Sequence, residues 1–222
     1  MRGTKKIDWL NHGLEFVMVV VGILIAFQLN TCSEEKKNDV IVNQHISNVL
    51  SESAFNLKMI DDIIVQTEDS QKNLSKLLQL IAQEKSWDTI NNLTLRQLNY
   101  SGVYLKDNAY NSLIQSGDIR LVNDFELKND IINLYEYYKW TQSFDLINGE
   151  VFAGYFLPYV MNEFDMFQLQ TQDASIYTDQ RFKNALGSMS YQMNARLAKY
   201  KETKTIIETF LRAHQKQTDD NL

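Results

Sequence analysis

The chain has 222 residues, of which 44% are hydrophobic and 23% are charged, and its formal net charge is −6. One proline and eight glycines are few for this length, which disfavours a β-sandwich or a loop-rich fold. The negative charge and the lack of a long basic run argue against nucleic acid as a partner, and a single cysteine excludes internal disulfide bonds.

The first predicted element is an apolar helix from Trp9 to Leu29, 21 residues long. No polar side chain occurs from Phe16 to Phe27. At 1.5 Å per residue the stretch is about 30 Å long, which matches the hydrocarbon core of a bilayer. We therefore predict a transmembrane helix over residues 9–31, after a short cytoplasmic segment at 1–8, and the lipid bilayer as a partner.

One face of this helix carries Glu15, Gly22, Ala26 and Leu29, at steps of seven, four and three residues. Gly22 and Ala26 form a small-xxx-small pair, which lets two helix backbones approach closely. We expect this face to pack against a second copy or another protein. Two alternatives stay open for Glu15: it lies at the membrane boundary, or it couples the protein to a proton or ion.

Basic residues on the two sides of the span predict its orientation. Arg2, Lys5 and Lys6 precede it, whereas Lys36 and Lys37 follow it. The positive-inside rule then places the N-terminus in the cytoplasm. The predicted location is the inner membrane, with the C-terminal domain in the periplasm or exterior.

Cleavage after the apolar core is a competing interpretation. The sequence LNTC, from Leu29 to Cys32, weakly resembles a lipoprotein signal, but Thr31 stands where a small residue is usual. We expect the N-terminal helix to be retained, with lipidation of Cys32 as the alternative.

Residues 32–213 are predicted to form one helical bundle of about four to six helices, followed by a polar tail at 214–222. Because no Pro or Gly occurs from Leu24 to Ser101, one long helix should leave the membrane and become one side of the bundle. The polar stretch Gln66–Asn73 either continues this helix or breaks it. Apolar residues at helical spacing support the helix: Val42, Ile46, Val49, Ala54, Leu57, Ile60, Ile64, Leu74, Leu77, Leu78 and Ile81.

A loop is predicted at Lys85–Thr89, with Trp87 as a packing residue, followed by a helix or irregular segment at Ile90–Tyr100. Asp107 or Asn108 should then cap a short helix at Ala109–Gln115.

Ser116 and Gly117 should end that helix in a structural turn with a left-handed glycine. The next helix should begin after a cap at Asn123 or Asp124 and continue to about Asn148.

An aromatic-rich helix is predicted at Gly149–Phe167, with Pro158 kinking or restarting it. A last long helix should start at Thr178 or Asp179 and fray from His214 onward.

Two parts of the chain resemble an uncharacterised bacterial family of small single-span membrane proteins, a domain of unknown function. The span GLEFVMVVVGILIAFQLN is similar to that family's GEIxLVVxGILIALQIN-type start, with Glu15 and Gly22 at matching positions. Cys32 stands where the family usually has an aromatic residue. The stretch from Ala109 to Tyr137 looks like the family's second pattern, with Tyr110, Leu113, Ser116, Gly117, Leu127, Ile131 and Tyr135 at the matching positions. The resemblance implies a membrane-anchored helical domain and supplies no activity.

The sequence contains no recognisable catalytic motif. His12, His45 and His214 are far apart, and none has a histidine, cysteine or paired carboxylate at metal-site spacing. His45 is expected on a helix surface. We therefore expect no catalytic residue, no cofactor and no metal, and hence no enzyme.

Aromatic residues are dense from Tyr135 to Tyr159. Core and helix–helix packing is the first interpretation, and an aromatic groove for a ligand or partner is the second. The groove would comprise Tyr135, Tyr138, Trp140, Phe152, Tyr155 and Phe156.

These features predict a membrane-anchored extracytoplasmic helical domain that acts as a non-enzymatic scaffold or partner-binding accessory subunit. One alternative is a bundle that senses a ligand bound between its helices. Another is an ion-coupled membrane complex subunit that uses Glu15, for which Glu15→Gln should abolish function while assembly persists.

Overall fold

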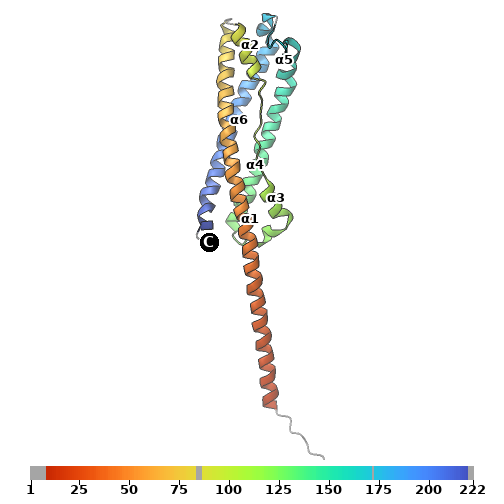
Figure 1. The fold of residues 1–222 in the computed structure, drawn as a ribbon, viewed down its shortest axis with the longest axis vertical. Helices are drawn as coiled ribbons and strands as arrows, with labels where there is room; N and C mark the ends of the chain where they lie inside the picture. Colours follow the sequence, from red (N-terminus) through yellow and green to blue (C-terminus); the bar gives the residue numbers. More distant parts are fainter. Residues whose placement is uncertain (1–8, 84–86, 172, 220–222) are drawn as a thin grey trace, which may run out of the picture.

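The computed structural model describes residues 9–83, 87–171 and 173–219 (Figure 1), with side chains described within 13–215. The predicted cytoplasmic segment at 1–8 and the side chain of His12 lie outside the described residues. Within the described ranges every regular element is helical and no β-strand forms, which confirms the all-α prediction.

One helix, α1, runs without interruption from Trp9 to Ala82. Its 74 residues make it about 110 Å long. The polar stretch Gln66–Asn73 continues the helix, and Thr67 and Leu74, seven residues apart, both lie on its buried face. The predicted long helix is therefore confirmed.

The N-terminal part of α1 projects alone from the bundle (Figure 1). Every residue from 13 to 30 is exposed. Among the described helices, α1 is the one that is long and apolar enough to cross a membrane, with an 18-residue window of mean hydropathy 2.0 and none of that window buried.

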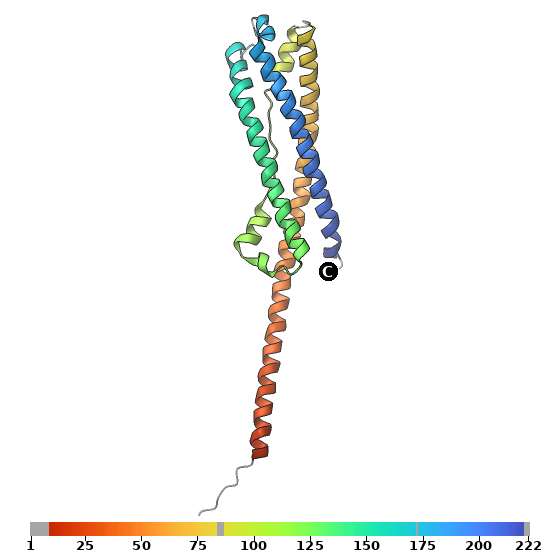
Figure 2. The ribbon, with the colours of Figure 1, turned by 180° about the vertical axis from the view of Figure 1, so that it is seen from behind.

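The bundle consists mainly of the C-terminal part of α1, α4 (Phe125–Val151) and α6 (Gln180–Asp219), which lie side by side in both views (Figures 1 and 2). Two clusters of buried side chains fill it. The cluster nearer the projecting helix includes Val49, Ile60, Leu113, Ile131, Tyr135, Tyr138, Tyr200 and Ile207. The cluster at the far end includes Leu74, Leu77, Ile90, Phe156, Val160, Tyr177, Phe182 and Leu186.

At the far end the aromatic-rich helix restarts at Pro158, as predicted. A π-helical turn, η2 (Phe152–Phe156), precedes α5 (Leu157–Glu163), and Pro158 lies in the first turn of α5. Proline has no N–H and its ring crowds the carbonyl four residues earlier, so the wider π turn accommodates it. The helix ends at Glu163 rather than at the predicted Phe167, because Phe164 has an extended backbone.

Near the projecting helix, α3 (Asn108–Gln115) is followed by Gly117, whose φ is 78°, and by the 3₁₀ turn η1 (Asp118–Leu121). This φ lies in the left-handed region that favours glycine. Asp124 then caps α4, because its Oδ1 accepts from the Leu127 N–H at 3.0 Å.

The segment between α1 and α3 differs from the prediction. Trp87 opens α2 (Trp87–Arg96) instead of lying in a loop, and its ring stacks on Tyr177 with centroids 5.3 Å apart. The helix then ends at Arg96, before the predicted limit at Tyr100. Residues 99–107, which we call the connecting segment, have no regular structure and run lengthwise between the long helices (Figures 1 and 2).

The C-terminal region also differs. After the 3₁₀ turn η3 (Ala174–Thr178), Asp179 caps α6 by accepting from the Arg181 N–H at 2.8 Å. The helix runs to Asp219, so it passes through His214, where the sequence predicts a frayed tail. His214 is buried because it continues the apolar face of α6 one turn beyond Phe210, on which its ring packs.

Candidate functional site

Side chains from two helices hydrogen-bond the backbone of the connecting segment at its α3 end. Asn56 of α1 bonds both backbone groups of Lys106: its Oδ1 accepts from the N–H at 2.8 Å, and its Nδ2 donates to the carbonyl at 2.9 Å. From α4, Gln142 Nε2 donates to the Leu105 carbonyl at 3.1 Å. A buried backbone without regular structure needs such partners, because its polar groups have lost water.

A buried ion pair holds the other end of the segment. Arg196 of α6 donates from Nε to Asp145 Oδ1 of α4 at 3.1 Å, and both side chains are buried. Asp145 Oδ2 also accepts from the Val103 N–H at 2.6 Å, while Arg196 Nη2 donates to the Ser101 carbonyl at 2.5 Å. Asp145 and Arg196 together therefore fix the connecting segment between α4 and α6.

Tyr200 completes this cluster. Its hydroxyl donates to Asp145, at 2.5 Å from Oδ1, and accepts from Arg196 Nη2 at 2.8 Å. Burial raises the pKa of Tyr200 far above its ordinary value. Burial also opposes the charge of Arg196, but the neighbouring Tyr200 and Asp145 outweigh it and raise the Arg196 pKa. The cluster is thus a neutralised ion pair beside a protonated phenol.

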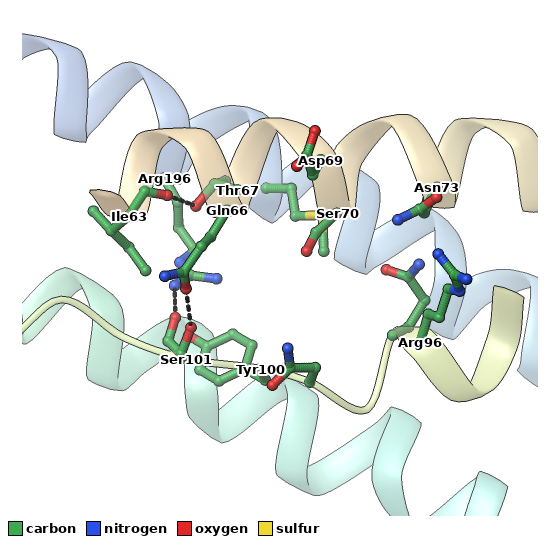
Figure 3. A pocket seen from close by; sticks show the side chains of 13 residues that line it. Ile63, Gln66, Thr67, Asp69, Ser70, Asn73, Arg96, Tyr100, Ser101 and Arg196 are labelled. Atoms are coloured by element: carbon green, nitrogen blue, oxygen red, sulfur yellow. Dashed lines mark hydrogen bonds between the residues drawn. The ribbon is translucent and has the colours of Figure 1, made fainter. Parts of the chain in front are cut away.

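Beside the Ser101 end of the segment lies a cavity of about 350 Å³ (Figure 3). It exists because a single extended chain is far thinner than the helix, about 10–12 Å across, that would otherwise fill this place in a bundle. Figure 3 shows it between α1 and the connecting segment, with Arg96 at one end and Arg196 at the other. The lining residues are Ile63, Gln66, Thr67, Asp69, Ser70, Asn73, Arg96, Gln97, Asn99, Tyr100, Ser101, Met193 and Arg196.

One residue that lines this cavity, Gln97, has an unsatisfied acceptor atom that is closed off from solvent. Gln97 is 3% exposed, and within the described part of the chain its Oε1 has no hydrogen-bond partner. Its Nε2 makes one long bond, of 3.4 Å, to the Leu93 carbonyl. Elsewhere in the cavity lining, the buried Thr67 hydroxyl donates to the Ile63 carbonyl at 2.7 Å and keeps its acceptor lone pairs. A buried polar group without a partner is uncommon in native proteins and needs an explanation.

Two arginines line the cavity. Arg196 is matched by Asp145 directly behind the wall. At the rim, the exposed Asp69 pairs with Lys72 at 3.4 Å, whereas the Arg96 Nε donates to the neutral Asn92 Oδ1 at 3.0 Å. The cavity is therefore rich in hydrogen-bonding groups and has the charge of Arg96 at its rim.

A second buried carboxylate stabilises the start of α3. Glu52 of α1 accepts from the Ala109 N–H at 3.1 Å and from the Tyr135 hydroxyl at 2.6 Å. Burial, and then the bond to Glu52, raise the pKa of Tyr135. The sequence predicts that Asp107 or Asn108 caps this helix, but the Asp107 side chain makes no capping hydrogen bond. Glu52 takes that role instead, which local sequence could not indicate.

Two histidines pair with aspartates near the projecting helix. His45 Nε2 lies 2.9 Å from Asp118 Oδ2, and His214 Nε2 lies 2.8 Å from Asp130 Oδ2. The expected surface position of His45 is therefore corrected, because η1 packs over it and leaves its side chain 14% exposed. Each His–Asp pair links two helical elements by a side-chain contact.

The predicted membrane face lies on the projecting part of α1. Glu15, Gly22 and Ala26 are all exposed there, and a Cβ added at Gly22 would meet nothing within 4 Å. No other part of the described chain covers Gly22 or Ala26, so this part of the face is available to another molecule.

The six aromatic residues of the predicted groove are not brought together. Tyr135 and Tyr138 are buried in the cluster near the projecting helix, whereas Phe152 and Phe156 belong to the far one. Trp140 and Tyr155 are exposed. The predicted groove is therefore corrected: four of these residues pack in the core instead. They lie on successive turns of α4 and η2, which direct them toward different neighbours.

Trp140 and Tyr137 instead cover a buried lysine. Lys199 Nζ lies 2.9 Å from the ring centre of Trp140 and donates to the Tyr137 hydroxyl at 2.7 Å. Burial lowers the pKa of Lys199. This contact is a cation–π interaction that closes the outer side of the α4–α6 pair.

Sequence reasoning missed Asp145, Arg196, Gln97 and Glu52. A signal was present for Arg196, which lies seven residues beyond the buried Met189 and four before the buried Tyr200, and so on the apolar face of α6. The described residues include no group of three or more His, Cys, Asp or Glu that could hold a metal ion.

Comparison with known proteins identifies a family. The family model described as "Family of unknown function (DUF6090)" matches residues 15–186, which include most of the projecting part of α1 and all of α2 to α5. No curated protein and no solved structure matches the chain. Because the model covers more than half of the sequence, the chain belongs to the family of unknown function DUF6090.

Proposed function

We propose that the N-terminal part of α1 spans a lipid bilayer and anchors the bundle to it. This proposal is supported by the large apolar side chains on residues 14–29, among them Phe16 and Phe27, which pack against nothing else in the described chain. An apolar surface of this extent is stable only when lipid or protein covers it.

The orientation follows from charge. With Arg2, Lys5 and Lys6 before the span and two lysines after it, the N-terminus lies in the cytoplasm. The bundle then lies on the outer side of a bacterial inner membrane, in the periplasm or exterior.

The anchored bundle acts as a non-enzymatic scaffold or accessory subunit that binds a partner protein. The observation that carries this proposal is the apolar surface on α4 and η2. Leu146 and Ile147 are 71% and 62% exposed, and Trp140 and Tyr155 are exposed near them along the chain. Trp140 and Ile147 are seven residues apart and therefore share one face of α4. Large exposed apolar residues on one helix face mark interaction surfaces.

Site-specific photocrosslinking tests partner binding. A photoreactive phenylalanine analogue at Ile147 should give an adduct of discrete mass in intact cells, whereas the same analogue at the exposed Asp62 of α1 should not. Equal adducts at both positions, or none at Ile147, Leu146 and Tyr155, would remove the proposal.

Ligand sensing is the second candidate function, and the cavity beside Ser101 favours it. Thr67 and Ser70 form part of its wall, and both belong to the helix that continues into the proposed span. A ligand that moved this wall would therefore act directly on the span.

A further inference from the structure

We propose that the outer face of the α4–α6 pair binds an amphipathic helix of a partner protein, with basic residues beside the apolar side of that helix. The inference names the partner class for the apolar surface on α4 and η2, so it rests on the partner-binding function proposed above.

Five apolar side chains, which we call the α4 stripe, recur at helical spacing along this face. They are Trp140, Phe144, Ile147, Val151 and Tyr155, at steps of four, three, four and four residues. Trp140, Ile147 and Tyr155 are 56%, 62% and 69% exposed, and the other two are half-buried. The stripe therefore leaves an apolar surface about 20 Å long in solvent.

A cavity of about 300 Å³ between α4 and α6 adjoins the stripe. Tyr137 lines the cavity, and its ring contacts that of Trp140 with centroids 5.2 Å apart. Apolar side chains from both helices also line it, namely Leu134, Ile206 and Phe210. The cavity and the α4 stripe thus belong to one surface.

Several polar groups that line this cavity already have partners. The hydroxyls of Thr205 and Thr209 donate to carbonyls one turn earlier on α6, at 3.0 and 2.8 Å. Asp130 Oδ2 lies 2.8 Å from His214 Nε2. These groups have no need of a hydrogen bond from outside, so the cavity suits a large apolar side chain that anchors a partner.

A helix is the element that fits this surface. The stripe and the cavity extend lengthwise along α4 and α6, which lie side by side in both views (Figures 1 and 2). An amphipathic helix binds such a groove with apolar side chains at steps of three and four residues. Within the described ranges no β-strand offers an edge for strand pairing.

Two carboxylates accompany the stripe. Glu136 is four residues before Trp140, and Glu150 is three residues after Ile147, so both lie beside the stripe on α4. Both are exposed, and neither forms an ion pair with a described residue. Basic residues of a helix that lies along α4 would pair with them.

The lysines near the stripe are engaged elsewhere. Lys139 Nζ lies 5.5 Å from the ring centre of Tyr110 on α3. Lys199, which Trp140 covers, pairs with Glu202 at 3.3 Å. The carboxylates of Glu136 and Glu150 therefore leave negative charge beside the stripe, and this charge is complementary to a basic helix.

The same charge disfavours two other occupants. Copies anchored in one membrane are parallel, so a two-fold contact through this face would bring each Glu136 against its equivalent. The negative surface of an anionic bilayer would also be repelled. A basic helix instead gains an attractive contact at each carboxylate.

Binding of model helices to the full-length protein in phosphatidylcholine nanodiscs tests the inference. Two labelled peptides of about 21 residues carry the same leucines at heptad positions a and d, and they differ only in lysine or glutamate at positions e and g. A third peptide has the composition of the lysine peptide in scrambled order. Fluorescence anisotropy measures affinity, empty nanodiscs report adsorption to lipid, and a thermal melt reports folding.

Matched variants locate the site. Glu136→Lys changes a carboxylate beside the stripe, and Asp62→Lys makes the same charge change at an exposed position of α1. Ile147→Ser removes an apolar side chain of the stripe, and Val65→Ser is its control on α1, where Val65 is 59% exposed. All four positions are exposed, so each variant should melt close to the parent temperature.

We expect the lysine peptide to bind with a Kd of about 10 μM or lower, at least about tenfold tighter than the other two peptides. Glu136→Lys should reduce its preference over the glutamate peptide by about threefold, and adding Glu150→Lys should abolish it. Ile147→Ser should weaken binding by about tenfold. Asp62→Lys and Val65→Ser should bind like the parent.

Three results would overturn the inference: equal binding of the lysine and glutamate peptides, undiminished binding to Ile147→Ser, or a signal that empty nanodiscs reproduce in full. If the lysine peptide fails while the analogue at Ile147 still crosslinks in cells, the basic helix is wrong and partner binding stands. If the crosslink fails as well, the proposed function falls by its own test.

Discussion

Asp145 and Arg196 are 51 positions apart in the sequence, yet they form a buried ion pair with Nε and Oδ1 separated by 3.1 Å. Both residues also bond the backbone of the connecting segment, through Val103 and Ser101. The pair therefore joins α4, α6 and the chain between α2 and α3, and its Arg196 forms part of the cavity wall.

Removing one partner of this pair should destabilise the bundle strongly. Asp145→Ala leaves Arg196 buried without a counter-charge and the Val103 N–H without its acceptor. The expected loss is about 3–5 kcal/mol of unfolding free energy. Denaturant unfolding followed by far-UV circular dichroism measures it. Asp69→Ala, at an exposed carboxylate, is the control and should change stability by about 0.5 kcal/mol or less. Similar losses in the two variants would show that the buried pair is not required.

Gly117 should be the least replaceable glycine of the bundle. Its φ of 78° is costly for any other residue, and an added Cβ would lie 3.0 Å from Arg120 Nη2. Gly117→Ala should lose about 1 kcal/mol and lower the melting temperature by roughly 2–4 °C.

The matched control for this substitution is Gly187→Ala, in the interior of α6, where an added Cβ meets nothing within 4 Å. There alanine should stabilise the helix by roughly 0.5–1 kcal/mol. Gly102 is a poor control, because a Cβ there would press on Asp145 Oδ2 at 3.1 Å. If Gly117→Ala melted at or above the parent temperature, the turn would not need a left-handed glycine.

The sequence predicts elements whose cause is local. Uninterrupted helical spacing and the lack of Pro and Gly from Leu24 onward predict the long course of α1. The left-handed Gly117 and the cap at Asp124 also lie where their residue types indicate. Contacts between residues that are distant in the chain are not indicated by the local sequence. Glu52 caps a helix 57 positions away, and only the folded bundle brings them together.

The cavity is hardest to predict for the same reason. The cavity forms because the connecting segment occupies the place of a helix. The residue types of this segment do not indicate that the segment will lie between α1 and α4. The position of Arg196 on the apolar face of α6 was the one local indication that a charged side chain enters the core.

Acid should weaken the contact between η1 and α1. Bonds from Ser116 and then His45 hold the pKa of Asp118 below its ordinary value of 3.8. Because the folded-state pKa is the lower one, the stabilisation is present above pH 3.8 and is lost as the pH falls through the folded-state pKa. Asp118→Asn should therefore melt below the parent at neutral pH and like it in strong acid. A difference that persisted unchanged in acid would contradict this coupling.

Self-association through the projecting helix should depend on Gly22. Replacing it by isoleucine holds two backbones apart, so energy transfer between labelled copies in nanodiscs should fall. Val21→Ile changes the neighbouring face and should leave the transfer unchanged. Equal effects of the two substitutions would show that the face with Gly22 and Ala26 is not the contact.

The single native cysteine gives the most direct test of the membrane-anchored arrangement. Cys32 is exposed on α1, directly after the proposed span. In intact spheroplasts, a membrane-impermeant maleimide should label Cys32 of the full-length chain, with no increase after lysis, because the proposed orientation places this residue on the outer face of the inner membrane. Labelling that appears only after lysis, or a mature chain that begins at an acylated Cys32, would contradict the account.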